Sequence, residues 1–300
     1  MCGISRVIRL RRFLTVGFCI FALSFAWADA KRYAAKGLVL KVDASHKTAT
    51  VSCQAIPGFM EAMVMPIAVR ETKELDGLTP GTTITFTLVV DTESSYGEGI
   101  KAQSYQGLEV DPLTARRLRL LNQAANPGSG PKMINAGEAV PDFVLLDQER
   151  HRVRLASFRG KVVVLNFIYT RCALPDFCFR SSNNFGLLQK RFRNQLGKQV
   201  VLLTVTFDPS HDDPETLRKY ATVWKADAQS WHFLTGSLAE IQGLCALFGV
   251  DVFPDEGLVT HSLHTIVIDR KGTMASNIEG NQFTADQLGD LVQTVLDQQQ

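Results

Sequence analysis

Two short, almost uninterrupted apolar runs constrain this sequence more than any other feature. They are VVVLNFIY at Val162–Tyr169 and VVLLTVTF at Val200–Phe207. Runs of this kind suit central strands that are covered on both faces, because a strand with one exposed face would alternate. After the second run, Asp213-Pro214-Glu215 supplies an N-cap followed by proline at the first helical position. Residues 139–300 are therefore expected to form an α/β domain with a partly parallel sheet.

The same domain contains further strand and helix signals. Three more strands are expected at Phe143–Leu146, His232–Leu234 and Leu263–Asp269. Capping boxes are expected at two helix starts, formed by Ser237 with Glu240 and by Thr284 with Gln287. One helical apolar stripe is expected, made of Phe185, Leu188, Phe192 and Leu196.

The residues before this domain have a different pattern. Short β-rich stretches lie at Leu38–Val42, Thr48–Cys53, Met63–Val69 and Thr82–Val90, with a turn expected at Ser94–Gly99. Five strands in roughly 75 residues predict a small closed, OB-like β-barrel. The stretch Asn122–Gly137 is rich in Gly, Pro, Asn and Ala and is typical of a linker. The expected plan is a barrel over 31–108, a linker over 109–138 with a short helix at Leu113–Asn122, and the α/β domain.

The first residues have the pattern of a secretory signal. Residues 1–12 carry four arginines and no acid, and an apolar run from Phe13 to Ala28 follows. Ala28-Asp29-Ala30 has the small-x-small form of a cleavage site. The run is shorter than the roughly 20 residues of a bilayer span. We therefore expect a cleaved signal peptide over residues 1–30, rather than an anchor retained at 13–28, and an exported, periplasmic protein.

Charge and cysteine content narrow the function. The formal net charge is +2, and residues 1–30 hold four arginines and one aspartate, so their removal leaves about −1. This balance argues against a nucleic-acid partner. Four cysteines then remain: Cys53, Cys172, Cys178 and Cys245. In an oxidising compartment an even number first suggests structural disulfides.

Cys172 and Cys178 follow directly on the strand Val162–Tyr169, where α/β sheets place ligands. A helix N-terminus nearby would lower a thiol pKa. Six residues apart on a continuous helix, the two side chains would point apart, but Pro175 and Asp176 favour a loop that brings the sulfurs together. The pair can then form a structural disulfide, exchange disulfides, or present two soft thiolates to Cu(I).

Three strings carry a family resemblance: FIYTRCALPDFC, LLTVTFDPSHDDPETLRKYA and LFGVDVFPDEGLVTHSLHTIVIDRKG. They resemble the Sco/SenC family of copper-delivery proteins, which have a thioredoxin-like fold, over residues 139–298. The resemblance implies Cys172, Cys178 and His261 as copper ligands, His261 being the histidine eleven residues before Gly272. It also implies that Asp208 supports the site. The implied metal is Cu(I), or Cu(II) at this site, and the implied acceptor is the copper centre of a respiratory oxidase.

The sequence departs from that family in the cysteine loop. Five residues separate Cys172 from Cys178, where the family has three, and Phe179 stands where the family has proline. The longer loop is expected to alter the copper geometry or to shift the balance towards redox work.

Methionines gather in the first domain at Met60, Met63 and Met65. In an extended segment Met63 and Met65 project from one face, and thioethers suit Cu(I) or Ag(I). Barrel core is the alternative interpretation. The segment CQAIPGFMEAMVMP, Cys53–Pro66, resembles CusF-type copper-binding barrels. The resemblance carries over Met63 and Met65 as ligands, and puts Cys53 at a histidine position and Met60 near an aromatic position.

The expected function is that of a copper chaperone whose transfer is gated by the thiol–disulfide state of Cys172 and Cys178. One alternative is an enzyme that uses the same cysteines, either a thiol–disulfide oxidoreductase acting on a partner protein or a peroxide-reducing thioredoxin relative. Another is a copper buffer without delivery. Cys245 is expected to be a buried small hydrophobe. Structural or surface roles are expected for the other histidines: His46, His151, His211, His232 and His264.

Overall fold

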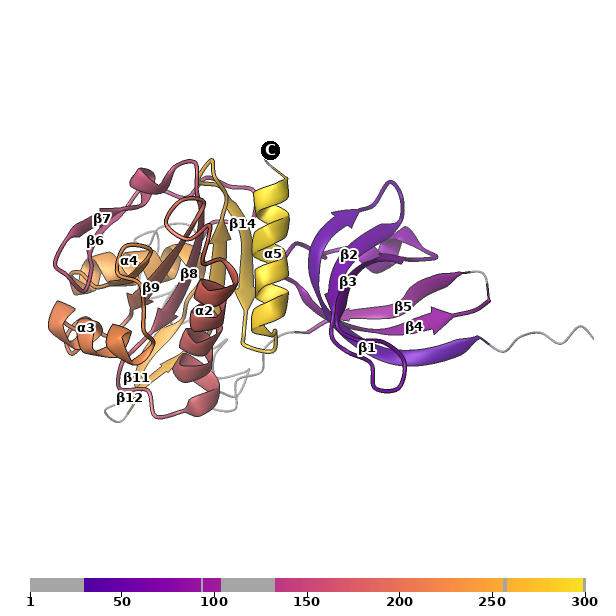
Figure 1. Ribbon diagram of the computed structural model, residues 1–300, viewed down its shortest axis with the longest axis horizontal. Coiled ribbons are helices and arrows are strands. Elements are labelled where there is room, and N and C mark those ends of the chain that lie inside the picture. Colours follow the sequence, from indigo (N-terminus) through magenta and orange to yellow (C-terminus); the bar gives the residue numbers. More distant parts are fainter. Residues whose placement is uncertain (1–29, 93, 104–132, 256–257, 299–300) are drawn as a thin grey trace, which may run out of the picture.

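A computed structural model describes residues 30–92, 94–103, 133–255 and 258–298, which form two domains (Figure 1). The expected signal peptide and the expected helix at Leu113–Asn122 lie outside these residues. The last residues of the expected linker pack on the second domain, where the Ile134 amide donates to the carbonyl of Leu247 at 3.1 Å.

The first domain is a five-stranded antiparallel sheet with the strand order β3-β2-β1-β4-β5. Its strands are β1 (Lys31–Asp43), β2 (Thr48–Cys53), β3 (Met63–Ala68), β4 (Thr83–Val90) and β5 (Ser95–Ala102). The turn expected at Ser94–Gly99 is wrong, because β5 already begins at Ser95. Instead, Ser94 contacts Asp91 at the start of β5: its amide and hydroxyl donate to the Asp91 carboxylate at 2.6 and 2.9 Å.

The small five-stranded β domain is confirmed, but its sheet stays open where a closed barrel was expected. Among the described residues, the two edges meet at one isolated bridge, between Val69 and Gly97. A Cβ atom at Gly97 would lie 2.6 Å from Cγ2 of Ile67 and 3.3 Å from the Phe86 ring. Glycine therefore permits the close approach, and apolar side chains fill the seam in place of a ladder of hydrogen bonds.

The second domain contains a five-stranded sheet with the order β10-β9-β8-β13-β14. Its strands are β8 (Val162–Ile168), β9 (Val200–Thr206), β10 (Trp231–Leu234), β13 (His264–Ile268) and β14 (Met274–Glu279). Strands β8, β9 and β10 are parallel, whereas β13 and β14 are antiparallel to their neighbours. Every residue of β8 and β9 is buried, which confirms the prediction from the two apolar runs. Two hairpins flank this sheet: β6 (Val144–Leu146) with β7 (Arg152–Arg154), and β11 (Val252–Asp255) with β12 (Leu258–His261).

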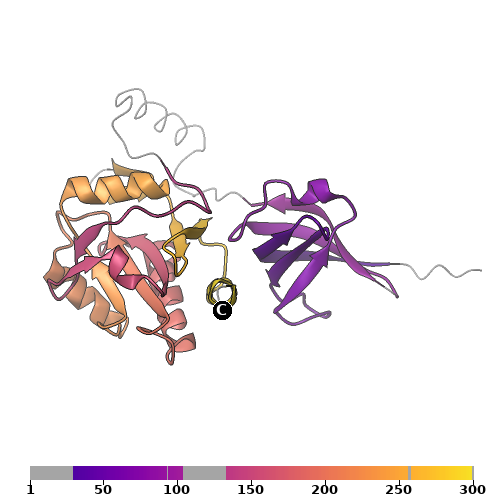
Figure 2. The same ribbon diagram turned by 90° about the horizontal axis from the view of Figure 1, so that it is seen from above.

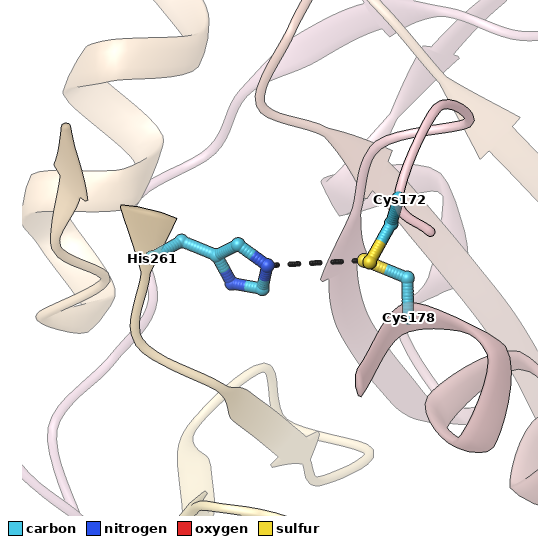
Figure 3. Close-up of side chains that lie close together, drawn as sticks. All are labelled: Cys172, Cys178 and His261. Atoms are coloured by element: carbon cyan, nitrogen blue, oxygen red, sulfur yellow. Dashed lines mark hydrogen bonds between the residues drawn. The ribbon is translucent and has the colours of Figure 1, made fainter. Parts of the chain in front are cut away.

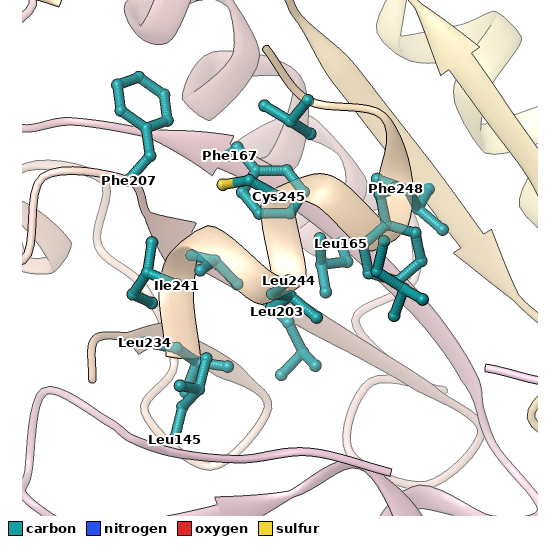
Figure 4. Close-up of a cluster of buried hydrophobic side chains, with 14 of the residues drawn as sticks. Leu145, Leu165, Phe167, Leu203, Phe207, Leu234, Ile241, Leu244, Cys245 and Phe248 are labelled. Carbon is teal, nitrogen blue, oxygen red and sulfur yellow. The ribbon is translucent and has the colours of Figure 1, made fainter. Parts of the chain in front are cut away.

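Helices cover both faces of this sheet. They are α2 (Arg180–Arg191), α3 (Pro214–Val223), α4 (Leu238–Phe248) and α5 (Ala285–Asp297). One face packs against α4, through a cluster that includes Leu165, Phe167, Leu203, Leu244 and Phe248 (Figure 4). The other face packs against α2, α3 and α5. Both capping boxes are confirmed, but α2 ends at Arg191, so the expected stripe is one turn too long.

The first domain packs directly on α5 (Figures 1 and 2). Hydrogen bonds join the two: the Gln287 side-chain amide donates to the carbonyl of Ser52 at 2.7 Å, and the Ser52 hydroxyl donates to Asp290 at 2.6 Å. One apolar cluster crosses the boundary and includes Leu38, Leu40, Ile278, Leu288 and Leu291. The junction is therefore a continuous core, not a flexible joint.

Replacement of Leu40 tests this shared core. Leu40 is 1% exposed, so Leu40→Ala leaves a cavity between the domains. We expect the free energy of unfolding to fall by roughly 2–5 kcal/mol, measured by urea denaturation. The matched control is Leu238→Ala, at a side chain that is 58% exposed, which should cost less than about 0.5 kcal/mol. Equal, small effects of both would contradict a shared core.

Candidate metal centre

The loop that follows β8 is anchored by a buried carboxylate. Asp212 is fully buried and accepts hydrogen bonds from the amide and hydroxyl of Thr170, at 3.0 and 2.5 Å, and from the hydroxyl of Thr206 at 2.6 Å. Thr170 lies at the start of the loop and Thr206 ends β9. Asp212 therefore fixes the loop to the edge of the neighbouring strand. Sequence reasoning missed this residue: the string DPSHDD places several acids after the strand but does not indicate which one is buried.

From Thr170 the chain passes Cys172 and enters a short π-helical turn, Pro175–Phe179, before α2. Cys178 lies within this turn and is 1% exposed, whereas Cys172 is half-buried. Both are free thiols. The turn brings the two sulfurs towards each other, as expected from Pro175 and Asp176 (Figure 3).

His261 completes the cluster from a distant part of the chain, at the end of β12. Its Nδ1 lies 3.0 Å from the carbonyl oxygen of Ser262, so Nδ1 carries the proton and donates. Nε2 faces the Sγ of Cys178 at 3.8 Å (Figure 3). The ligand atoms of Cys172, Cys178 and His261 all lie within 4.8 Å of one another, and they form the one such group found among the described residues.

The two thiols differ in acidity. The pKa of Cys172 falls to about 4, first because Cys178 donates a hydrogen bond to its thiolate; burial opposes this, and His261 contributes a further hydrogen bond. The same hydrogen bond and burial raise the pKa of Cys178 well above its ordinary value. At neutral pH the pair therefore carries a thiolate at Cys172 and a proton on Cys178.

Aromatic side chains surround the imidazole. The ring centroids of Phe207, Tyr169 and Phe177 lie 4.4, 5.9 and 6.3 Å from that of His261, the last two in edge-on geometry. All three side chains are buried. The cluster therefore has an apolar wall on the imidazole side.

Asp208 lies in a polar network beside the loop, outside the group of three ligand atoms. It accepts from Arg171 at 2.7 Å and contacts Nδ1 of His211 at 2.9 Å. Burial acts to raise the pKa of Asp208, but the hydrogen bonds from His211 and Arg171 outweigh it and hold the pKa below its ordinary value. The carboxylate orients Arg171, the residue before Cys172, and so supports the loop from its outer side.

The first domain places Cys53 and the methionines at one corner of its sheet. In the β2–β3 ladder Cys53 pairs with Met63, and Val51 pairs with Met65. Side chains of directly paired residues share a face, so Cys53, Met63 and Met65 lie on the same side. Cys53 is buried, and burial raises its pKa to about 11, whereas Met63 is 51% exposed. Met60 packs partly buried against the same core.

The remaining cysteine has a structural environment. Cys245 lies on α4 in the apolar cluster with Phe167 and Phe207 (Figure 4), and burial raises its pKa to about 12. This confirms the expectation of a buried small hydrophobe. In the part of the chain that is described, no helix is both long and apolar enough to cross a membrane.

A dithiol and an imidazole at the carboxyl edge of a thioredoxin-like sheet define a class of site that binds soft metals or exchanges disulfides. The chain belongs to the SCO1/SenC family, whose sequence profile matches residues 131–297. Residues 32–96 match a second family, described as the copper-binding periplasmic protein CusF.

Individual relatives share the second domain. The chain is 28% identical over 152 residues to the protein sco1 of Schizosaccharomyces pombe, covering 48% of this chain and 56% of that protein. Two solved structures are also similar. One is BsSco, described by its disulfide switch and as a member of the Sco family of cytochrome c oxidase assembly proteins (25% identity, TM-score 0.47, 55% of this chain and 97% of that one). The other is Arabidopsis thaliana ScoI with copper bound (23%, 0.46, 52% and 98%).

The pH dependence of alkylation tests the acidity of Cys172. Thiolate is the reactive form, so with a pKa of about 4 the rate with iodoacetamide should be flat from about pH 6 to 8 and fall only in acid. Cys178→Ala removes the hydrogen-bond donor and should move the midpoint upward. Mass spectrometry of the modified peptide separates Cys172 from Cys53 and Cys245. A wild-type rate that climbs steadily through pH 8 would contradict the assignment.

Proposed function

We propose that this chain binds copper as its cargo at Cys172, Cys178 and His261 and delivers it to the copper centre of a respiratory oxidase. One observation carries the proposal: two sulfurs and an imidazole nitrogen from distant segments lie within 4.8 Å of one another. Thiolate and imidazole suit Cu(I), which needs few ligands, and an imidazole that is oriented through Nδ1 by a backbone carbonyl, with Nε2 directed inward, suits a metal. Family membership supports copper, and the cytochrome c oxidase assembly role named for BsSco supports an oxidase as acceptor.

The thiol state gates copper binding in this proposal. Oxidation of the Cys172 thiolate and the Cys178 thiol forms one S–S bond and releases two electrons and the single proton of Cys178 to an oxidising partner, such as a disulfide, which is reduced to one thiolate and one thiol. The disulfide has no thiolate to offer, so copper binds only to the reduced protein. The lowered pKa of Cys172, about 4, supports both roles, because thiolate is the metal ligand and also the nucleophile.

The first domain captures Cu(I) in the same proposal. Met63 and Met65 supply thioethers, Cys53 supplies a thiol on the same face, and Met60 lies against the same core. The match of residues 32–96 to the copper-binding protein CusF supports this role. Because burial keeps Cys53 protonated, copper binding there must release a proton when the sulfur becomes a ligand.

The location and the domain division complete the proposal. We place the protein in the periplasm after export by the signal peptide at residues 1–30. The working division is a copper-binding β domain over 31–108, a linker over 109–138 and the Sco-type domain over 139–300. The periplasmic description of the CusF family supports this location.

A thiol–disulfide oxidoreductase is the second candidate, and the unequal thiols favour it. Cys172 is partly exposed with a lowered pKa, whereas Cys178 is buried and protonated, which suits an attacking and a resolving thiol. Turnover of a disulfide substrate that is lost in Cys172→Ser but unchanged in His261→Ala would favour this enzyme. Loss of copper binding in both variants would favour the chaperone.

Copper stoichiometry tests the two sites. Anaerobic titration of the reduced protein with Cu(I) should give two equivalents per chain. Cys172→Ser should remove one equivalent and Met63→Leu with Met65→Leu the other, because each set of changes removes soft ligands. Met133→Leu, at an exposed methionine outside both sites, should change nothing. No uptake by the reduced wild-type protein would exclude the copper proposal.

Oxidase assembly tests delivery. A strain that lacks this protein should show low activity of a copper-containing oxidase, measured as oxygen uptake. The wild-type gene should restore activity, whereas Cys172→Ser and His261→Ala should not, because neither variant keeps the full ligand set. Cys245→Ala is the control cysteine variant and should restore it. If the oxidase of the deletion strain contains its full amount of copper, the chain acts as a copper buffer and not in delivery.

A further inference from the structure

We infer that Phe177, which lies in the loop between the two cysteines, is a specificity-determining residue that closes one side of the thiol–imidazole site. It admits a small soft ion and holds back bulky thiol reagents and competing ligands. The inference about copper release rests on the proposed function, but the inference about thiol access does not.

The ring of Phe177 is buried next to His261. Phe177 precedes Cys178 directly and is 8% exposed, and its ring meets that of His261 edge-on, at 6.3 Å between centroids and 81° between planes. The ring is therefore a buried neighbour of the imidazole. An aromatic edge at this distance packs against the imidazole without supplying a ligand.

The three rings around His261 come from different parts of the chain. Tyr169 follows β8 and Phe207 follows β9, so both belong to the rigid edge of the sheet. Of the three rings around His261, Phe177 is the one carried by the cysteine loop itself. Any movement that opens the loop must take this ring off the imidazole.

Phe179 lies in the same turn as Phe177 but points away from the site. The side chain of Phe179 is 55% exposed, and its ring packs against Trp224 at 4.9 Å, away from the site. The backbone leaves helical geometry at Phe177, with φ −108° and ψ −110°. This bend turns two successive side chains, Phe177 and Cys178, into the protein and leaves Phe179 outside.

Phe177 is the last of the five residues between the cysteines and precedes Cys178 directly. Cys178 is 1% exposed and directly follows Phe177, whereas Cys172 is partly exposed. In this inference, a bulky reagent reaches the second sulfur only when the Phe177 ring moves. A cuprous ion needs no water ligands and fits such an apolar enclosure, whereas larger or more hydrated groups do not.

The test compares Phe177→Ala with Phe179→Ala, the same substitution in the same turn. For this measurement, each variant is made in a Cys172→Ser background, because Cys178 would otherwise displace a mixed disulfide formed at Cys172. In these reduced, copper-free proteins, the rates of modification of Cys178 by iodoacetamide and by the bulky aromatic disulfide DTNB are measured by mass spectrometry. We expect the DTNB rate to rise about tenfold in Phe177→Ala, because the lost ring contact is of that size. The iodoacetamide rate should rise less. Phe179→Ala should stay near wild type, and Phe177→Leu, which keeps the bulk, should restore most of the protection.

The second measurement is the rate at which the Cu(I)-loaded protein gives up copper to the chelator bicinchoninate. Phe177→Ala should release copper about tenfold faster, with Phe179→Ala unchanged. Equal rates in the two alanine variants would overturn the inference. The inference would also be overturned if Phe177→Ala raised the modification rates with both reagents equally, to the rate of the urea-unfolded protein. In that case the ring would only keep the loop folded. If the reduced protein binds no Cu(I), the proposed function fails, while the thiol rates still decide the role of Phe177.

Discussion

The site depends on the hydrogen bonds of one buried carboxylate. Asp212 accepts from Thr170 at the start of the cysteine loop and from Thr206 at the end of β9. The two sulfurs come from this loop and the imidazole of His261 comes from a hairpin far along the chain, so the loop must leave the sheet in one direction for them to meet. With three donors, the buried side chain of Asp212 has its hydrogen-bonding capacity met by the protein. The anchor therefore fixes the geometry before any metal arrives.

The two domains treat their thiols in opposite ways. Burial holds Cys53 in the protonated form, with a pKa of about 11, whereas the hydrogen bond from Cys178 holds Cys172 as thiolate, with a pKa of about 4. Under the proposed function, copper at the first site has to displace a proton and copper at the second site meets a ready ligand. At equal soft-ligand strength, this difference favours movement of copper from the first domain to the second.

Much of the fold could be predicted from local patterns, and the remainder depends on distant contacts. Continuous apolar runs identified β8 and β9, and capping boxes identified the starts of α4 and α5, because these signals are local. The open seam of the first domain could not be predicted, since it depends on Gly97 meeting Ile67 across the sheet. At the site, the motifs named the cysteines and His261. The role of Asp212 could not be predicted, because it depends on where β8 and β9 end relative to each other, and the spacing of residues along the chain does not give this.

The shared core between the domains has a consequence for the evolution of such a chain. Leu38 and Leu40 of β1 complete the packing of α5, so a boundary drawn between two family matches does not coincide with a boundary in the folded protein. Excision of the first domain would uncover an apolar helix face, and a domain exchanged from a relative would need the matching leucines and a partner for Gln287. The two domains therefore form one packing unit, in which a substitution on one side of the shared core limits the substitutions that the other side accepts.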